Sequence, residues 1–136
     1  MIALVAVASV ALATHALLIM QPELLALRRL VTGEASWFPQ LGEAWWRRGP
    51  ARLMAELAGL LRQAGKDGEL AIDHPELAAQ QLQWLILSIP INKAMLCPDQ
   101  AYTSEELHRY SDEGVRTFLA YQPAGPAPAS AGPGGH

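Results

Sequence analysis

Hydrophobic positions recur at helical spacing along the chain from Ile2 to Phe118, and no segment shows the strict alternation of a half-buried strand. The first 20 residues contain no Lys, Arg, Asp or Glu, and they form the first apolar helix of the pattern. A second helix is expected to begin at Pro22, because proline suits a first helical turn, and to end before Pro39. The pattern predicts an all-α protein.

Three further helices follow in this pattern. Apolar residues from Leu41 to Leu61 predict a third helix with Gly68 after its end. Gly49-Pro50 interrupts this helix. A proline inside a helix destabilises it by about 3 kcal/mol, and burial of a neighbouring tryptophan can stabilise the fold by a similar amount. We therefore expect a kinked helix rather than two separate helices. The fourth helix, 75–96, is apolar on nearly every side, and the fifth, 104–121, begins with the capping box of Thr103 and Glu106.

Composition limits the classes of function. Ten Lys and Arg against thirteen Asp and Glu give a net charge of −3 without a basic face, so we expect no direct nucleic acid binding by this chain alone. Cys97 is the only cysteine, which excludes an internal disulfide. Residues 123–136 are rich in Pro, Gly and Ala without apolar periodicity, and they predict a disordered tail after a helical domain of residues 1–122.

Candidate chemistry is sparse. No known nucleophile, acid–base or phosphate-binding motif is present, so we expect neither an enzyme nor a cofactor. Glu105 and His108 have the spacing of a di-iron helix motif, but such bundles need this motif twice, and we predict no metal site. Cys97 is expected to be a small apolar residue at a helix end. His15 is open to two interpretations, a hydrogen-bonded core residue or part of a pocket.

Four segments, taken in order, resemble the C-terminal regulatory domain of TetR-type bacterial transcription factors. They are "PELLALRRLVTGEASWFPQL", "WWRRGPARLMAELAGLLRQAGKDGEL", "DHPELAAQQLQWLILSIPINKAML" and "EELHRYSDEGVRTFLAY". The resemblance covers about residues 10–121. It implies a domain that binds a small, mostly apolar effector among its helices and forms a homodimer through its last two helices. The expected fold is therefore an all-α, five-helix orthogonal bundle whose last two helices form the dimer interface.

Two sets of residues are candidates for these functions. The pocket is expected to lie between helices that carry His15, Trp45, Met54, Trp84 and Asn92. The dimer interface is predicted from the surplus of apolar residues on the last two helices, together with a glycine that would let a partner helix approach: Leu82, Leu85, Ile89, Leu107, Tyr110, Gly114 and Phe118.

Residues 2–20 leave two alternatives. The resemblance implies a buried helix beside the cavity, and six alanines with Ser9 and Thr14 suit close helix packing. The length also suits a membrane anchor or a secretion signal, which would make the chain a small membrane-anchored or exported helical protein. We favour the buried helix, a cytoplasmic location and no membrane partner. The helix-turn-helix domain that precedes this domain in the family has no counterpart here; truncation, a misassigned start and a stand-alone module each account for that.

Overall fold

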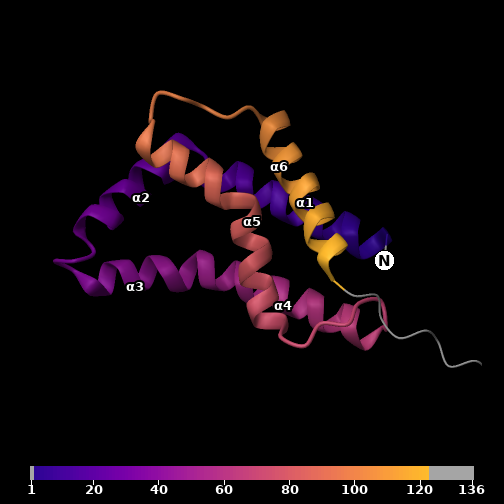
Figure 1. Cartoon of the computed structure of the whole chain (residues 1–136). Coiled ribbons are helices and arrows are strands. Elements are labelled where there is room, and N and C mark those ends of the chain that lie inside the picture. The colour runs from indigo at the N-terminus through magenta and orange to yellow at the C-terminus, as the bar shows by residue number, and fades with distance from the viewer. Residues whose placement is uncertain (1, 123–136) are drawn as a thin grey trace, which may run out of the picture.

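The computed structural model describes residues 2–122, with side chains from residue 6 onward, so the tail predicted at 123–136 lies outside the described residues. The described chain consists of six helices without a strand, which confirms the all-α fold (Figure 1). Their bounds are α1 Ile2–Ile19, α2 Pro22–Glu34, α3 Pro39–Arg48, α4 Pro50–Lys66, α5 Pro75–Leu96 and α6 Ser104–Tyr121.

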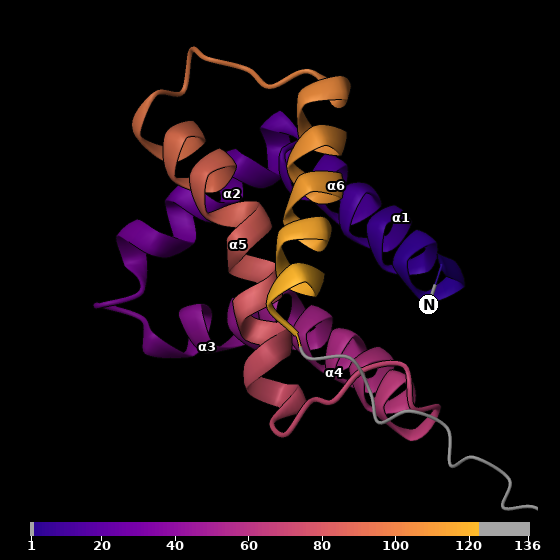
Figure 2. The same cartoon turned by 45° about the vertical axis from the view of Figure 1, so that its right-hand side comes forward.

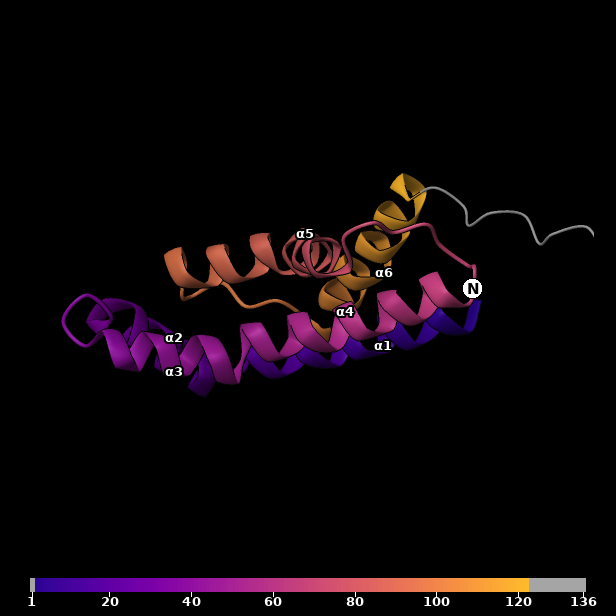
Figure 3. The same ribbon diagram turned by 90° about the horizontal axis from the view of Figure 1, so that it is seen from below.

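Proline marks the start of four of these helices: α2, α3, α4 and α5. A first-turn N–H has no partner inside the helix, so proline loses nothing there and its fixed φ favours the helical conformation. Pro50 therefore begins a new helix where the sequence predicted a kink. Gly49, at φ −114° and ψ −90°, is the single residue between α3 and α4. The two helices run nearly end to end, so the predicted third helix is present in two pieces (Figure 3).

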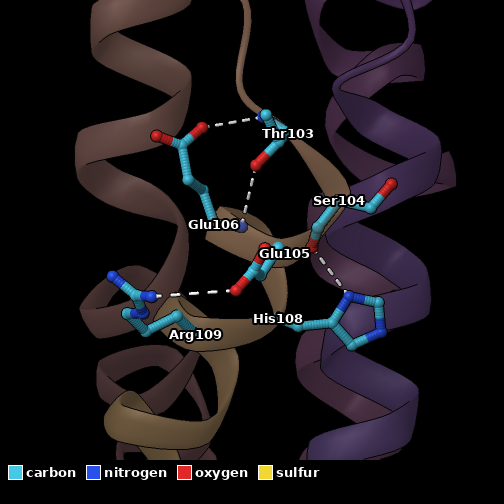
Figure 4. A network of polar contacts seen from close by, with 6 residues as sticks. All are labelled: Thr103, Ser104, Glu105, Glu106, His108 and Arg109. Atoms are coloured by element: carbon cyan, nitrogen blue, oxygen red, sulfur yellow. Dashed lines mark hydrogen bonds and ion pairs between the residues drawn. The ribbon is translucent and has the colours of Figure 1, made fainter.

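Helix α6 begins with the predicted capping box. The Thr103 hydroxyl accepts a hydrogen bond from the Glu106 N–H at 3.1 Å, and the Glu106 carboxylate accepts one from the Thr103 N–H at 2.8 Å (Figure 4). Two backbone N–H groups that the helix itself leaves unpaired are satisfied reciprocally, which fixes where the helix starts.

Helices α5 and α6 cross the layer formed by α1 to α4, and α6 lies across α1 (Figures 1 and 3). Helix α5 is sharply bent in its middle, so that one part is seen lengthwise and the other end-on in Figure 3. Pro90 lies inside this helix and cannot donate a hydrogen bond to the Ile86 carbonyl, which is an established cause of a bend.

The core lies where α1, α4, α5 and α6 meet. Leu12, Leu57, Ile86, Leu87 and Phe118 come from these four helices and are at most 5% exposed. Burial of such side chains is worth about 1.5–3 kcal/mol each, so this junction contributes substantially to the stability of the fold.

Helix α1 contributes a buried face rather than a freestanding segment. Leu12, Ala13 and Ala16 are at most 3% exposed, whereas Val10 and Leu18 remain 66% and 56% exposed. Small residues allow α6 and α4 to approach this face closely. Within the described residues, no single helix meets the length and hydropathy needed to cross a membrane; the bent pair Ala6–Ile19 and Pro22–Glu34, with 73° between its halves, meets them only jointly. The packing supports the buried-helix interpretation of residues 2–20.

Candidate functional site

A cavity of about 430 Å³ lies between α1, α2, α3, α5 and the first residue of α4. Helices α2 and α3 meet at the turn around Trp37 and diverge from it, so that they flank this region like the two arms of a V (Figures 1 and 2). The bend in α5 and the break at Gly49 lie beside the same region, and Gly49 and Pro50 belong to the wall. The volume is within the range of about 300–1,000 Å³ that is usual for small-molecule sites.

The wall is mainly apolar. Its apolar side chains come from α1, α2, α3 and α5: Ile19, Leu24, Leu27, Val31, Leu41, Ala44, Trp45, Trp84, Leu87 and Ile91. Leu24, Leu27 and Leu41 remain 37%, 44% and 39% exposed although they are large and apolar. These three leucines stay partly uncovered because they face the cavity. An apolar ligand would bury the surface that the chain leaves uncovered.

Four helices of the wall each add one polar residue: His15 from α1, Arg28 from α2, Arg48 from α3 and Gln83 from α5. Gln83 is 2% exposed, and its Oε1 has no hydrogen-bond partner among the described residues. Burial lowers the pKa of His15 from its ordinary value, opposed by the nearby Glu56 carboxylate. Burial also lowers the pKa of Arg28. The cavity therefore combines an apolar wall with a few polar groups that are poorly compensated within the described chain.

Three of the five residues predicted for the pocket, His15, Trp45 and Trp84, lie in its wall. Met54 does not, because α4 reaches the cavity only through Pro50. Asn92 is exposed, and its Nδ2 donates a hydrogen bond to the Ser88 carbonyl at 2.6 Å, which uses its donor within the helix.

Arg28, Arg48 and Gln83 were not predicted for the pocket, although their spacing contains the signal. Arg28 follows Leu24 by four residues and precedes Val31 by three, which puts all three on one face. Gln83 precedes Leu87 and Ile91 by successive steps of four, and Arg48 follows Trp45 by three. In the sequence, a polar residue three or four positions from the apolar residues of one helix face indicates a polar group in the wall of an apolar pocket.

The residues predicted for a dimer interface fall into two groups in the structure. Four are buried within the chain itself. Leu82, Leu107 and Phe118 are at most 5% exposed, and Gly114 is also buried. Leu85 and Ile89 are 48% and 60% exposed, and Tyr110 is half-buried with its ring edge-on to Tyr102 at 5.9 Å. The helix that approaches Gly114 is α5 of the same chain, through Ile86. The buried four hold α6 in the core, and Leu85 and Ile89 present a free surface.

The polar side chains at the start of α6 interact with groups of the same helix. His108 Nδ1 lies 2.7 Å from the Ser104 carbonyl, and Glu105 and Arg109 form an ion pair at 4.0 Å (Figure 4). Within the described part of the chain, no three His, Cys, Asp or Glu side chains are grouped so that they could hold a metal ion. Cys97 is the half-buried C-cap residue that follows α5, at a helix end as expected.

The family of AefR-like transcriptional repressor C-terminal domains matches residues 7–123. The chain therefore belongs to this family of TetR-type transcriptional regulators, which confirms the resemblance seen in the sequence. This is a regulatory and non-enzymatic family, so the prediction that the chain is not an enzyme is also confirmed.

The fold is similar to the crystal structure of a TetR-family transcriptional regulator from Mesorhizobium loti, with a TM-score of 0.74 and 33% sequence identity. The match covers 88% of this chain and 64% of that chain, so the present chain spans less than two thirds of its solved relative. No curated protein matches the chain.

Proposed function

We propose that this chain is the effector-binding and dimerisation domain of a TetR-type transcriptional regulator, that its ligand is a small, largely apolar molecule, and that it acts in the cytoplasm. The observation that carries the proposal is the cavity between α1, α2, α3 and α5, whose wall leaves Leu24, Leu27 and Leu41 uncovered. A folded chain gains stability when such a surface is covered, so a ligand of matching shape should bind and stabilise the fold.

The neutral apolar fluorophore 1-aminoanthracene tests this site. Ala44 lies in the cavity wall on α3, and a phenylalanine there would occupy space that the probe needs. Ala26 is exposed on α2 outside the wall and supplies the matched control. We expect probe fluorescence to rise on binding to the wild type and to Ala26→Phe, and to fail to rise with Ala44→Phe.

Thermal unfolding of each variant, with and without probe, is measured alongside. The probe should raise the melting temperature of the wild type and not that of Ala44→Phe, because it binds only the folded state with a free cavity. Binding that is equal in Ala44→Phe and Ala26→Phe, with both folded, would place the probe elsewhere and remove the main support for effector binding.

Dimerisation is proposed through an exposed apolar stripe on α5 that consists of Leu77, Leu85, Ile89 and Leu96, which are 51%, 48%, 60% and 81% exposed. Leu77, Leu85 and Ile89 are separated by eight and four residues, which places them along one side of α5 before Pro90, and Leu96 lies beyond the bend. A row of large apolar side chains in water is typical of a surface that a second subunit covers.

Light scattering over a range of concentrations tests the stripe. We expect the wild type to be a dimer and Leu85→Asp with Ile89→Asp to be a monomer, since a buried, unpaired carboxylate costs several kcal/mol at an interface. Leu18→Asp is the control, because Leu18 is a similarly exposed leucine, at 56%, on α1. A monomeric wild type, or a dimer that survives both aspartates, contradicts the proposed interface.

A further inference from the structure

The cavity contains cationic groups that nothing in the described chain neutralises. Arg28 and Arg48 lie in its wall, and no Asp or Glu of the described residues belongs to that wall. Neither arginine forms an ion pair with a described residue; the pairs that the described residues form involve Arg52, Arg62, Arg109 and Arg116. The Glu56 carboxylate acts on His15, but it is already paired with Arg52 at 3.4 Å and lies outside the wall.

A guanidinium in this position is costly without a partner. Arg28 is half-buried among Leu24, Leu27 and Val31, and burial alone lowers its pKa from the ordinary value. Partial desolvation of a charge is unfavourable unless an opposite charge or hydrogen-bond acceptors replace the lost water. Its neighbour Arg29 has such an acceptor, since its Nη2 donates to the Ala94 carbonyl at 2.8 Å and ties α2 to the end of α5. Arg28 has none among the described residues, and it faces the cavity instead.

The two unpaired arginines stand on opposite walls. Arg28 is on α2 and Arg48 on α3, the two arms that diverge from the turn at Trp37 (Figure 2). Arg28 lies six residues before the end of α2 and Arg48 nine residues after the start of α3, which is about 9 Å and about 14 Å along the two helices at a rise of about 1.5 Å per residue. A ligand held between the arms would therefore meet a cation from each side.

Gln83, on α5, is a further polar residue of the cavity wall whose side-chain oxygen, Oε1, lacks a hydrogen-bond partner among the described residues. The residue is 2% exposed. Buried amide groups are nearly always hydrogen-bonded in native proteins, and Oε1 is an acceptor, so it calls for an N–H or O–H donor and does not bear on the charge of the ligand.

We propose that the effector is an amphiphilic monocarboxylate, whose apolar body lies against the leucines and tryptophans of the cavity and whose carboxylate is held between Arg28 and Arg48. This inference rests on the proposed function and narrows its ligand class. A single carboxylate matches the planar fork of a guanidinium and offsets its charge, which a neutral apolar molecule does not. An ion pair with the half-buried Arg28 would also be stronger than one at the surface, whereas Arg48 is exposed and would add a solvated cation at the edge of the site.

The test compares octanoate with octan-1-ol by isothermal titration calorimetry, because the two share one apolar chain and differ in the charged head. The full chain is used as wild type, Arg28→Gln, Arg48→Gln and Arg47→Gln. Arg47 is adjacent to Arg48 at the end of α3 but is outside the cavity wall, so it controls for general charge. We expect the wild type to bind octanoate about tenfold more tightly than octan-1-ol, as for a hydrogen bond to a charged group.

Arg28→Gln and Arg48→Gln should each remove most of this preference and leave the octan-1-ol affinity within about twofold. Arg47→Gln should leave both affinities unchanged. Should Arg28→Gln fail to fold, Arg28→Lys keeps the charge without the two-pronged geometry, and we expect it to retain an intermediate preference for octanoate.

Three results would overturn the inference. Equal or tighter binding of octan-1-ol by the wild type, or equal losses in Arg28→Gln and Arg47→Gln, would show that the arginines do not hold the head group; the proposed function would stand, since the cavity still binds an apolar molecule. Failure of the wild type to bind octanoate, octan-1-ol and 1-aminoanthracene would overturn this inference and the proposed function together.

Discussion

At Gly114, α6 packs directly against Ile86 of α5, and replacement of this glycine by alanine tests that contact. A Cβ at position 114 would clash with Cγ1 of Ile86, and it would also lie 3.2 Å from Cδ1 and 3.6 Å from Cβ of that residue. Ile86 is 1% exposed, and a β-branched side chain in a helix has one strongly preferred χ1, so it has little freedom to move away. The helices must separate or Ile86 must leave its rotamer.

The magnitude follows from two opposing terms. Overpacking of this kind costs about 1–3 kcal/mol, whereas alanine favours the helix over glycine by about 1 kcal/mol. The free energy of unfolding of Gly114→Ala should therefore be equal to that of the wild type or lower by as much as about 2 kcal/mol. Gly59 supplies the matched control, since it lies inside α4 and a Cβ added there would meet no atom within 4 Å. Gly59→Ala should stabilise the fold by about 1 kcal/mol.

Urea unfolding followed by circular dichroism, at one fixed protein concentration, measures these differences. The same substitution is then made with Ile86→Ala, which removes the opposing atoms. Ile86→Ala alone should cost about 2–5 kcal/mol, and in that background Gly114→Ala should stabilise, because the new methyl group fills part of the vacated space. If Gly114→Ala stabilises the wild-type chain as much as Gly59→Ala does, the close packing of α5 on α6 is refuted.

Three further outcomes are expected. Because burial lowers the pKa of His15, the unfolded chain binds this proton more readily, so stability should fall as the pH drops below the ordinary value of 6.5, and His15→Gln should weaken that fall; an identical pH profile in both proteins would contradict the burial. Thr103→Ala removes the hydroxyl of the capping box and should cost about 1 kcal/mol in urea unfolding, whereas an unchanged midpoint would show that the cap is not formed. With a net charge of −3, the chain by itself should bind DNA no more tightly than about 10⁻⁴ M, and a salt-resistant mobility shift at sub-micromolar protein would overturn this.

The sequence allowed the helices to be predicted because their signals are local. Proline at Pro22 and Pro75 and the capping box at Thr103 each act within one helical turn, and each helix begins where its signal predicted. Pro50 carries the same signal, but an expected gain from tryptophan burial outweighed it in the prediction. Trp46 is in fact 47% exposed, so that gain is small, and the chain breaks at Gly49.

The site was only partly predictable because its walls come from helices distant in sequence. Trp45 and Trp84 were predicted for the pocket, whereas Arg28 was not, and a charged residue is usually solvated rather than part of a pocket wall. The surplus of apolar residues on α5 was recognised, but a one-dimensional pattern does not show which side faces the chain's own α6. Gly114 and Leu82 were therefore assigned to a partner, and the structure buries both within the chain.

The four tryptophans supply the most direct test of the cavity as the ligand site. Trp45 and Trp84 lie in its wall, whereas Trp37 and Trp46 are outside it and are 80% and 47% exposed. Each indole N–H gives its own signal in a ¹H–¹⁵N correlation spectrum, so the four report on one titration with octanoate or 1-aminoanthracene. We expect the signals of Trp45 and Trp84 to shift saturably while those of Trp37 and Trp46 stay in place. Saturable shifts confined to Trp37 and Trp46, or no shift at any of the four, would show that the ligand does not bind in this cavity.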